Sequence, residues 1–257
     1  MLSPIEQHYN KHKEELRLQR RHGQVEFAVT MHYLKRYLTP GCRILDIGAG
    51  TGHYTFALMD MGYEVDAVEL VQRNINVMRQ QRADARVRKA DARDLHFIAD
   101  DSYDVVLLFG PMYHLMNEEE QLKALDEAKR VLKPGGTLLV AYLQNEYSII
   151  AYCFDQNRMA DLMRSGNVDP SFHIRPDEGE LYNYVRLSDA TRMNEQLGLR
   201  RITAFSPDGP TDYIRLKINY MTDENFDLYI RYVMQIAERP DLLGAASHLV
   251  DVLTYEE

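Results

Sequence analysis

The sequence predicts an α/β fold built on a parallel, doubly wound sheet. Between Arg43 and Leu143, apolar runs of strand length alternate with amphipathic segments of helix length. A glycine-rich turn at 48–52 directly follows the first apolar run, and a Lys-Pro-Gly-Gly turn precedes the last one. Such alternation is typical of parallel strands joined by helices that cover both faces of the sheet.

The expected elements can be placed along the chain in order. A helix over 24–38 ends at Thr39-Pro40-Gly41. Strands are predicted at 43–48, 63–70, 85–90, 103–110 and 137–143, with helices at 53–62, 71–82 and 118–132. The rhythm then changes to a helical stretch at 146–165, a polar and aromatic-rich stretch at 166–187, a helix at 188–197, a strand at 200–206, helical stretches at 212–221 and 223–238, and a strand at 247–255.

One α/β domain with additions is expected from the 257 residues, of which 45% are hydrophobic. The first addition is an N-terminal helical arm or lid at 1–41. The domain itself covers 42–257, with insertions at about 144–187 and 207–242 that we expect to gather over one edge of the sheet.

Composition narrows the function classes. The chain has 39 acidic and 30 basic residues, so its formal net charge is -9, which disfavours a nucleic-acid partner unless basic residues cluster. Cys42 and Cys153 are too few and too far apart for a disulfide framework or a cysteine zinc site, and we expect no metal site. The N-terminus lacks a signal-peptide core, and no run approaches the roughly 20 apolar residues of a membrane span. A cytoplasmic protein without a membrane partner is expected.

The glycine-rich turn lies where open parallel sheets bind ligands, beyond the carboxyl end of a strand. Gly48 and Gly50 fit the start of a dinucleotide fingerprint, but His53 occupies the position of its third glycine. The Gly-Lys-Ser/Thr of a phosphate loop is also missing. Asp46 would repel phosphate and attract a cationic ligand. A purely structural turn remains the alternative.

Acidic residues end the next two predicted strands. Glu69 is placed to accept hydrogen bonds from vicinal ribose hydroxyls, a use shared by several nucleosides. Asp91 could accept a hydrogen bond from an adenine amino group while the amide of Ala92 donates to the ring. The alternatives are a solvated acid at the end of a strand for Glu69 and a helix cap for Asp91.

Taken together, these stretches resemble the class I S-adenosylmethionine-dependent methyltransferases. The resemblance covers 43–143 and rests on "ILDIGAGTGHYTFAL", "VDAVEL", "KADARDL", "YDVVLLFGPMYHL" and "EAKRVLKPGGTLLVAYL", in that order. It implies a Rossmann-like sheet of seven strands with an antiparallel seventh strand, for which 247–255 is the candidate. It also implies S-adenosylmethionine as cofactor and S-adenosylhomocysteine as its product.

The resemblance also implies a set of cofactor-binding residues. The methionine part would face the first turn, the ribose and adenine would meet the ends of the second and third strands, and the sulfonium would lie near the end of the fourth. The corresponding residues are Asp46, Gly48, Ala49, Gly50 and Thr51, then Glu69, Leu70, Asp91 and Ala92, and finally Phe109 and Gly110.

The acceptor side is predicted from the residues after the fourth strand. Enzymes that methylate nucleobase amino groups usually carry Asn/Asp-Pro-Pro-Tyr/Phe there, but this chain has Gly110-Pro111-Met112-Tyr113. A small-molecule acceptor is therefore expected. Tyr113 and His114 are the catalytic candidates, because a neutral histidine has a suitable pKa for a general base. In the alternative, Tyr113 packs and His114 orders the loop by hydrogen bonding.

Other substrate contacts are predicted from two further segments. Tyr9 and His22 lie in the N-terminal arm, and His173 and Arg175 lie in the 166–187 stretch, which is long for a structureless connector. That stretch could be a lid, an acceptor-binding segment or a hairpin on the sheet edge. A monomer or homodimer is expected.

Three other functions stay open from the sequence. They are a nicotinamide-dependent oxidoreductase, an S-adenosylmethionine-binding module without catalysis, and an RNA methyltransferase. The last would require the scattered arginines to form one surface: Arg17, Arg20, Arg21, Arg73, Arg79, Arg82, Arg86 and Arg88.

Overall fold

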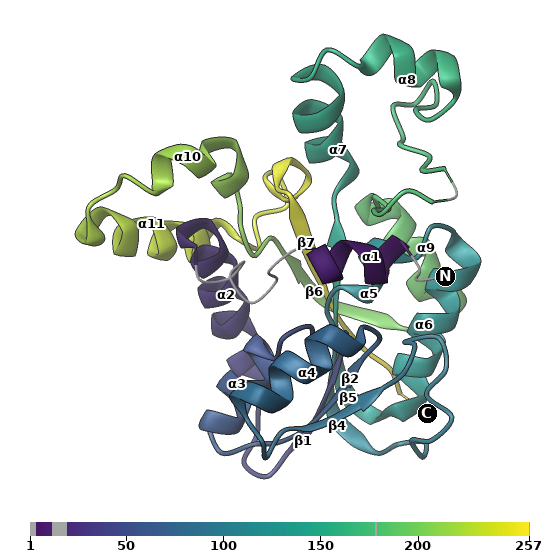
Figure 1. The fold of residues 1–257 in the computed structure, drawn as a ribbon, viewed down its shortest axis with the longest axis vertical. Helices are drawn as coiled ribbons and strands as arrows, with labels where there is room; N and C mark the ends of the chain where they lie inside the picture. Colours follow the sequence, from purple (N-terminus) through teal and green to yellow (C-terminus); the bar gives the residue numbers. More distant parts are fainter. Residues whose placement is uncertain (1–3, 12–19, 178, 257) are drawn as a thin grey trace.

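The computed structural model describes residues 4–11, 20–177 and 179–256 (Figure 1). The strands are β1 (Arg43–Ile47), β2 (Glu64–Glu69), β3 (Arg86–Lys89), β4 (Tyr103–Leu108), β5 (Leu132–Leu143), β6 (Arg200–Phe205) and β7 (His248–Thr254). The α-helices are α1 (Pro4–Lys11), α2 (Arg21–Leu34), α3 (His53–Asp60), α4 (Gln72–Gln81), α5 (Pro111–His114), α6 (Glu118–Val131), α7 (Asn145–Ser148), α8 (Met159–Ser165), α9 (Leu187–Gln196), α10 (Arg215–Ile218) and α11 (Asp223–Ile236). Short 3-10 helices cover Lys35–Tyr37, Thr211–Ile214 and Leu243–Ala245, and a π-helical segment covers Ile149–Phe154.

In the described part of the chain, the strands form one seven-stranded sheet in the order β3-β2-β1-β4-β5-β7-β6. The pairs from β3 to β5 are parallel, and β7 runs antiparallel to both of its neighbours. The predicted doubly wound fold with an antiparallel last strand is confirmed. Because β7 is reversed, it begins where β5 ends: His248 pairs with Leu143.

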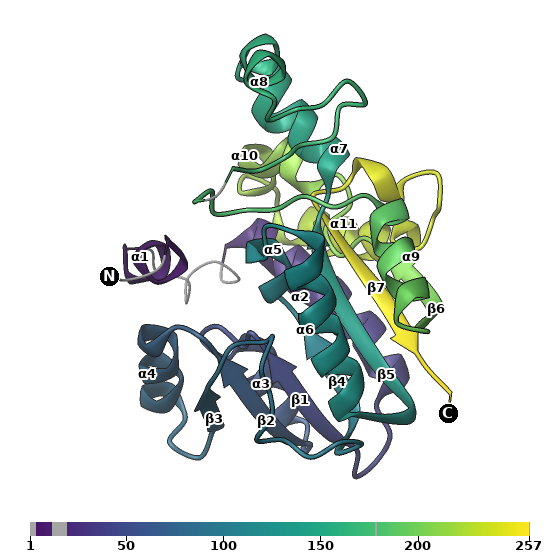
Figure 2. The same cartoon turned by 90° about the vertical axis from the view of Figure 1, so that its right-hand side faces the viewer.

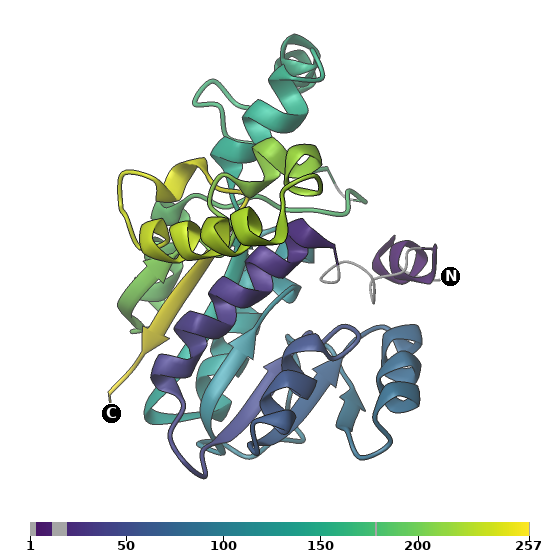
Figure 3. The same cartoon turned by 90° about the vertical axis from the view of Figure 1, so that its left-hand side faces the viewer.

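Helices cover both faces of this sheet (Figures 2 and 3). Successive strand residues point to opposite faces, so Leu45 and Ile47 join the core that α6 and α9 cover. Ile44 joins the opposite core, which contains Val29 of α2 and Val233 of α11. Burial on both faces explains why the strands read as continuous apolar runs in the sequence.

Two predicted elements differ from the observed ones. The fifth strand begins at Leu132, not at residue 137, because Leu132 pairs with Tyr103 before the register shifts at the Lys-Pro-Gly-Gly turn. The helical stretch predicted over 146–165 is divided into α7, the π-helical segment and α8. Asn157, with φ of 55°, adopts a left-handed conformation in the turn between the last two, so no continuous helix passes through it.

The additions gather around the carboxyl end of the sheet. Helix α1 lies over this end, while α7, α8 and α10 rise beyond it (Figures 1 and 2). Helix α2 packs in the core, where Tyr33 stacks on Phe205 with ring centroids 4.2 Å apart. Residues 12–19 of the predicted arm lie outside the described ranges. Within those ranges, no helix combines the length and the apolar content needed to cross a membrane.

A close approach between two loops shapes the carboxyl end of β1. Gly48 adopts φ of +81°, and a Cβ built there would lie 2.4 Å from Cδ of Pro111 and 2.8 Å from the carbonyl oxygen of Phe109. Only glycine accommodates both the conformation and the contact. The turn after β1 and the loop after β4 therefore sit side by side.

We predict that Gly48→Ala lowers the free energy of unfolding by about 2–3 kcal/mol, because it adds a clash to left-handed strain. Gly41→Ala is the matched control, since Gly41 has φ of +80° with nothing within 4 Å of its built Cβ. That control should lose only about 1 kcal/mol. Urea denaturation of both variants measures the difference, and equal losses would contradict the importance of the loop contact.

Candidate active site

A cavity of about 990 Å³ opens at the carboxyl end of the sheet. Helix α1, the start of α2 and residues 179–184 lie over it, and the loops that follow the strands form its floor. Most of the sequence-predicted site residues line this cavity. They are Tyr9, His22, Asp46, Gly48, Ala49, Gly50, Thr51, Glu69, Leu70, Asp91, Ala92, Phe109, Gly110, Tyr113 and His114.

Two of the sequence-predicted substrate contacts, His173 and Arg175, do not line the cavity. The Nε2 atom of His173 lies 3.4 Å from a carboxylate oxygen of Asp189, and Arg175 pairs with Asp169 at 3.1 Å. Asp169 also accepts hydrogen bonds from the amides of Ser171 and His173, and thereby closes a local turn. The later part of the same segment does reach the cavity, through residues 179, 180, 182 and 184.

At one end of the cavity, the Glu69 carboxylate joins two turns. One oxygen accepts a hydrogen bond from the amide of Gly50 at 2.8 Å, and the other accepts one from the amide of Val71 at 2.7 Å. Burial raises the pKa of Glu69 to about 7, although these amide hydrogen bonds oppose the shift. The glycine turn after β1 is thus fixed against the start of α4.

Asp46 lies beside this turn with one carboxylate oxygen unused. Its Oδ2 accepts a hydrogen bond from the Thr55 hydroxyl at 2.6 Å, whereas Oδ1 has no partner among the described residues. The Thr51 hydroxyl and the Asn74 side-chain oxygen are likewise buried without a partner in that part of the chain. Burial raises the pKa of Asp46 to about 6. Unsatisfied buried polar atoms beside a cavity favour a polar ligand there.

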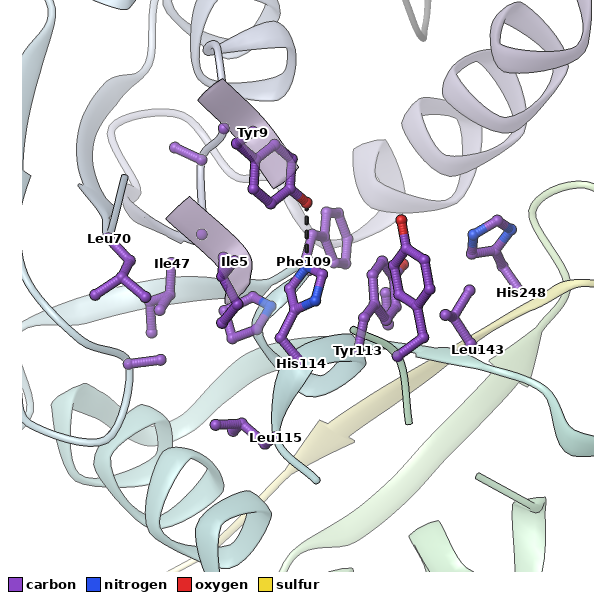
Figure 4. Close-up of a pocket in the computed structure, with 18 of the residues that line it drawn as sticks. Ile5, Tyr9, Ile47, Leu70, Phe109, Tyr113, His114, Leu115, Leu143 and His248 are labelled. Atoms are coloured by element: carbon purple, nitrogen blue, oxygen red, sulfur yellow. Dashed lines mark hydrogen bonds between the residues drawn. The ribbon is translucent and has the colours of Figure 1, made fainter. Parts of the chain in front are cut away.

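His114 connects the loop after β4 to the segments above it. Its Nδ1 lies 2.8 Å from the carbonyl oxygen of Leu181, so Nδ1 carries the proton and donates it. Its Nε2 then accepts from the Tyr9 hydroxyl at 3.1 Å (Figure 4). Burial lowers the pKa of His114, which keeps the ring neutral. Because both ring nitrogens have partners, the geometry favours the loop-ordering interpretation of His114 over a general base.

The other end of the cavity is acidic and aromatic, and most of its residues were missed from the sequence. Figure 4 shows Tyr113 between His114 and His248, and the Tyr113 and His248 rings have centroids 5.8 Å apart. Beyond them lie Tyr147, Tyr152, Tyr184, Glu26, Asp208, Asp212 and Arg215. The stretch "SPDGPTD" after β6 is the sequence signal that could have identified Asp208 and Asp212. It follows a strand, and the carboxyl ends of all parallel strands lie at this edge of the sheet.

Comparison with known proteins finds a methyltransferase domain and methyltransferase relatives. Residues 44–136 match a family model described as a methyltransferase domain. A demethylmenaquinone methyltransferase of Renibacterium salmoninarum is 42% identical over 103 residues, which are 40% of this chain and 41% of that protein. A ubiquinone/menaquinone biosynthesis C-methyltransferase of Vibrio vulnificus is 31% identical over 170 residues, or 60% and 59% of the two chains. These matches support a class I S-adenosylmethionine-dependent methyltransferase.

The fold comparison agrees. A solved S-adenosylmethionine-dependent methyltransferase of Thermotoga maritima, described as a possible histamine N-methyltransferase, superposes with a TM-score of 0.61 at 18% identity. The match covers 98% of this chain and 99% of that one. The sequence matches are shorter: they span about two fifths of the first curated relative and about three fifths of the Vibrio protein. S-adenosylmethionine is the cofactor of this methyltransferase family, and a nicotinamide-dependent oxidoreductase is not supported.

Five of the arginines considered for an RNA surface are engaged with protein groups. Arg21 pairs with Asp223, Arg82 with Asp60 and Asp84, and Arg86 with Glu64 and Asp66. Arg79 donates to the carbonyl oxygen of Val87, and Arg88 lies over the Phe97 ring. Arg17 lies outside the described residues. These pairings do not favour the RNA methyltransferase alternative.

We predict that Tyr9→Phe loosens α1 from the cavity, because it removes the hydrogen bond to His114. A net loss of about 1 kcal/mol corresponds to roughly fivefold faster local opening. Hydrogen–deuterium exchange of residues 4–11 measures it. Tyr220→Phe is the control, since Tyr220 is 89% exposed and does not line the cavity. Unchanged exchange in Tyr9→Phe would show that the contact does not hold α1.

Proposed function

We propose that this protein transfers the methyl group of S-adenosylmethionine to a small molecule bound in the same cavity. The supporting observation is the continuity of one cavity with two chemically different ends. One end holds Glu69 and the unsatisfied Asp46 oxygen, and the other is walled by tyrosines and acids. Phe109 and Gly110, directly after β4, line the same cavity.

The polar groups at the first end fit the cofactor. Asp46 Oδ1 and the Thr51 hydroxyl would bind the amino-acid part, because a cationic ammonium satisfies an acceptor that the fold leaves unpaired. Glu69 would accept from the ribose hydroxyls with lone pairs that its two amide donors leave available. Gly48, Ala49 and Gly50 would give the cofactor close access to the backbone.

The adenine would lie against the ends of β2 and β3. Leu70 would cover one face of the ring, and Asp91 with the amide of Ala92 would meet its edge. Asp91 is paired with Arg93 at 2.6 Å, and this pairing lowers the pKa of Asp91 against the opposing effect of burial. Asp91 therefore stays ionised and able to accept a hydrogen bond at neutral pH.

S-adenosylmethionine, when bound, would supply a methyl group on a sulfonium, with the electrons of the broken C–S bond kept by sulfur and the new bond made by a lone pair of the acceptor. The chain contributes alignment and exclusion of water. Phe109 and Gly110 would form the wall at the reacting centre, and Tyr113 would contact the acceptor. His114 would act as a positioning residue, because its hydrogen bonds tie α1 and the Leu181 segment over the cavity.

A small molecule is the acceptor that the available observations support. The names of the two curated relatives point to menaquinone and ubiquinone biosynthesis, which involves small molecules. The Asn/Asp-Pro-Pro-Tyr/Phe motif of nucleobase methylation is absent from the loop after β4. Tyr9 and His22, which line the cavity from α1 and α2, would be further acceptor contacts.

Ligand binding tests the cofactor part of this proposal. Isothermal titration should show binding of S-adenosylmethionine and S-adenosylhomocysteine and none of NAD. Each ligand at about 100 times its Kd should add roughly 2.7 kcal/mol to the free energy of unfolding. Absence of binding by both sulfur ligands would overturn the proposed function.

Glu69→Gln is predicted to weaken S-adenosylhomocysteine binding about 10- to 100-fold, because hydrogen bonds to a charged group contribute about 1.5–3 kcal/mol. Glu64→Gln is a matched control at the opposite end of the same strand, where Glu64 pairs with Arg43 and Arg86. The control should bind with unchanged affinity. Equal affinity in both variants would remove Glu69 from the cofactor site.

Cofactor affinity should also rise with pH between about 5 and 8, because the ionised forms of Glu69 and Asp46 are the better acceptors. Their pKa values in the free protein are raised to about 7 and about 6. The raised pKa values also affect the stability of the free protein, because the folded state binds the protons of Glu69 and Asp46 more tightly than the unfolded state does. Their contribution to the free energy of unfolding is therefore present at low pH and lost as pH rises through about 7. Titration calorimetry across this range tests the affinity trend, which Glu69→Gln should flatten near pH 7.

A further inference from the structure

We infer that the methyl acceptor carries a protonated amine, which binds in the compartment formed by Glu26, Asp208, Asp212, Tyr147 and Tyr152. We call these residues the acidic compartment. This inference rests on the proposed function, since it assigns a substrate class to the acceptor end of the same cavity. All five residues line that cavity.

The fold brings the acidic compartment together from distant parts of the chain. Glu26 lies in α2, Asp208 follows β6, and Asp212 lies in the 3-10 helix after it. Tyr147 belongs to α7 and Tyr152 to the π-helical segment. His248, at the start of β7, holds Asp208 in place: its Nδ1 and one Asp208 oxygen are 2.8 Å apart.

The compartment gathers three carboxyl groups in its interior. Glu26 is 9% exposed and Asp208 3%, and the Asp212 side chain is 8% exposed. Arg215, one of the basic residues beside them, pairs with Asp212 at 2.8 Å but keeps 49% of its side chain exposed. Solvent screens the guanidinium more than it screens the buried carboxylates, so the enclosed space favours a cation.

The titration behaviour of neighbouring groups agrees with this charge distribution. Burial and then the charges of Asp212 and Glu26 raise the pKa of Asp208, against the favourable effect of His248. Burial and then the charge of Asp212 also raise the pKa values of the Tyr147 and Tyr152 hydroxyls. The carboxylates therefore act on one another and on the surrounding tyrosines, and a bound ammonium would relieve this repulsion.

The aromatic walls suit an organic ammonium group. The Tyr147 and Tyr152 ring centroids lie 6.1 Å apart in an edge-to-face arrangement, and Tyr113 and Tyr184 also line the cavity. Aromatic faces attract ammonium groups and also pack against the carbon atoms that carry them. Carboxylates combined with tyrosine rings therefore match an amine better than a neutral or anionic acceptor.

A divalent metal ion fits the same residues less well. Ligand atoms of Asp208, Asp212 and His248 lie within 4.8 Å of one another. However, the His248 nitrogen and the Asp208 carboxylate already bond to each other, and Arg215 donates to one Asp212 oxygen from both Nε and Nη2. The Arg215 guanidinium on Asp212 would repel a divalent metal ion more strongly than a singly charged ammonium. We therefore assign the compartment to an amine.

Titration calorimetry on protein saturated with S-adenosylhomocysteine tests the inference. The probes share one ring and differ in charge: 2-phenylethylamine, 2-phenylethanol and 3-phenylpropionate. The amine should bind at least about tenfold more tightly than the other two, as expected for a hydrogen-bonded charge pair. Equal or tighter binding of the alcohol or the carboxylate would overturn the inference.

Variants locate the binding site of the amine. Asp212→Asn and Glu26→Gln should each weaken 2-phenylethylamine about tenfold or more while leaving S-adenosylhomocysteine affinity unchanged, which also shows that the variants are folded. Asp241→Asn is the control, because Asp241 is an exposed acid paired with Arg239 outside the cavity. Unchanged amine affinity in both compartment variants would overturn the assignment.

Three outcomes separate the hypotheses. Binding of magnesium or manganese ions that is lost in Asp212→Asn and competes with the amine would make the compartment a metal site and overturn the inference. Failure of S-adenosylhomocysteine to bind would overturn the proposed function itself. Binding of S-adenosylhomocysteine without any preference for the amine would overturn only the substrate class.

Discussion

The cofactor end of the cavity depends on one buried carboxylate. The Glu69 carboxylate accepts hydrogen bonds from the amides of both Gly50 and Val71. It therefore joins the glycine turn after β1 to the residue that precedes α4. Burying a carboxylate is costly, and two amide donors offset only part of that cost, which explains why the pKa of Glu69 is raised. The same residue therefore shapes the turn and keeps acceptor capacity for a ligand.

The reversed last strand provides the second half of the site. If β7 ran parallel to its neighbours, its first residue would lie at the opposite edge of the sheet. Because it is antiparallel, His248 begins beside Leu143 and reaches Asp208 after β6. The acceptor end is thus built on strands outside the segment that matches the methyltransferase domain, residues 44–136. Relatives that share the matched segment can therefore differ in the part of the cavity outside it, and so in the acceptor that they bind.

The sequence was sufficient to predict site residues that lie near the ends of predicted strands. It was insufficient to predict sites formed by residues that are far apart in the chain. Asp46 and Glu69 lie near the carboxyl ends of β1 and β2, and Asp91 lies two residues after β3, so spacing alone places them at one edge. The acidic compartment joins residues 26, 147 and 212, whose proximity no spacing rule gives. His173 was chosen for its residue type within a long polar segment, but the turn closed by Asp169 keeps it outside the cavity.

The distribution of buried acids also has an electrostatic logic. A sulfonium and an ammonium enclosed in one cavity repel each other, and low polarity strengthens that repulsion. Asp46 and Glu69 are buried at one end, while Glu26, Asp208 and Asp212 are buried at the other. Each cation would therefore have its own carboxylates, and the two positive groups could approach across Phe109 and Gly110 at a lower cost. A neutral acceptor would leave the repulsion among the acids at the second end unrelieved, although His248 and Arg215 pair with two of them.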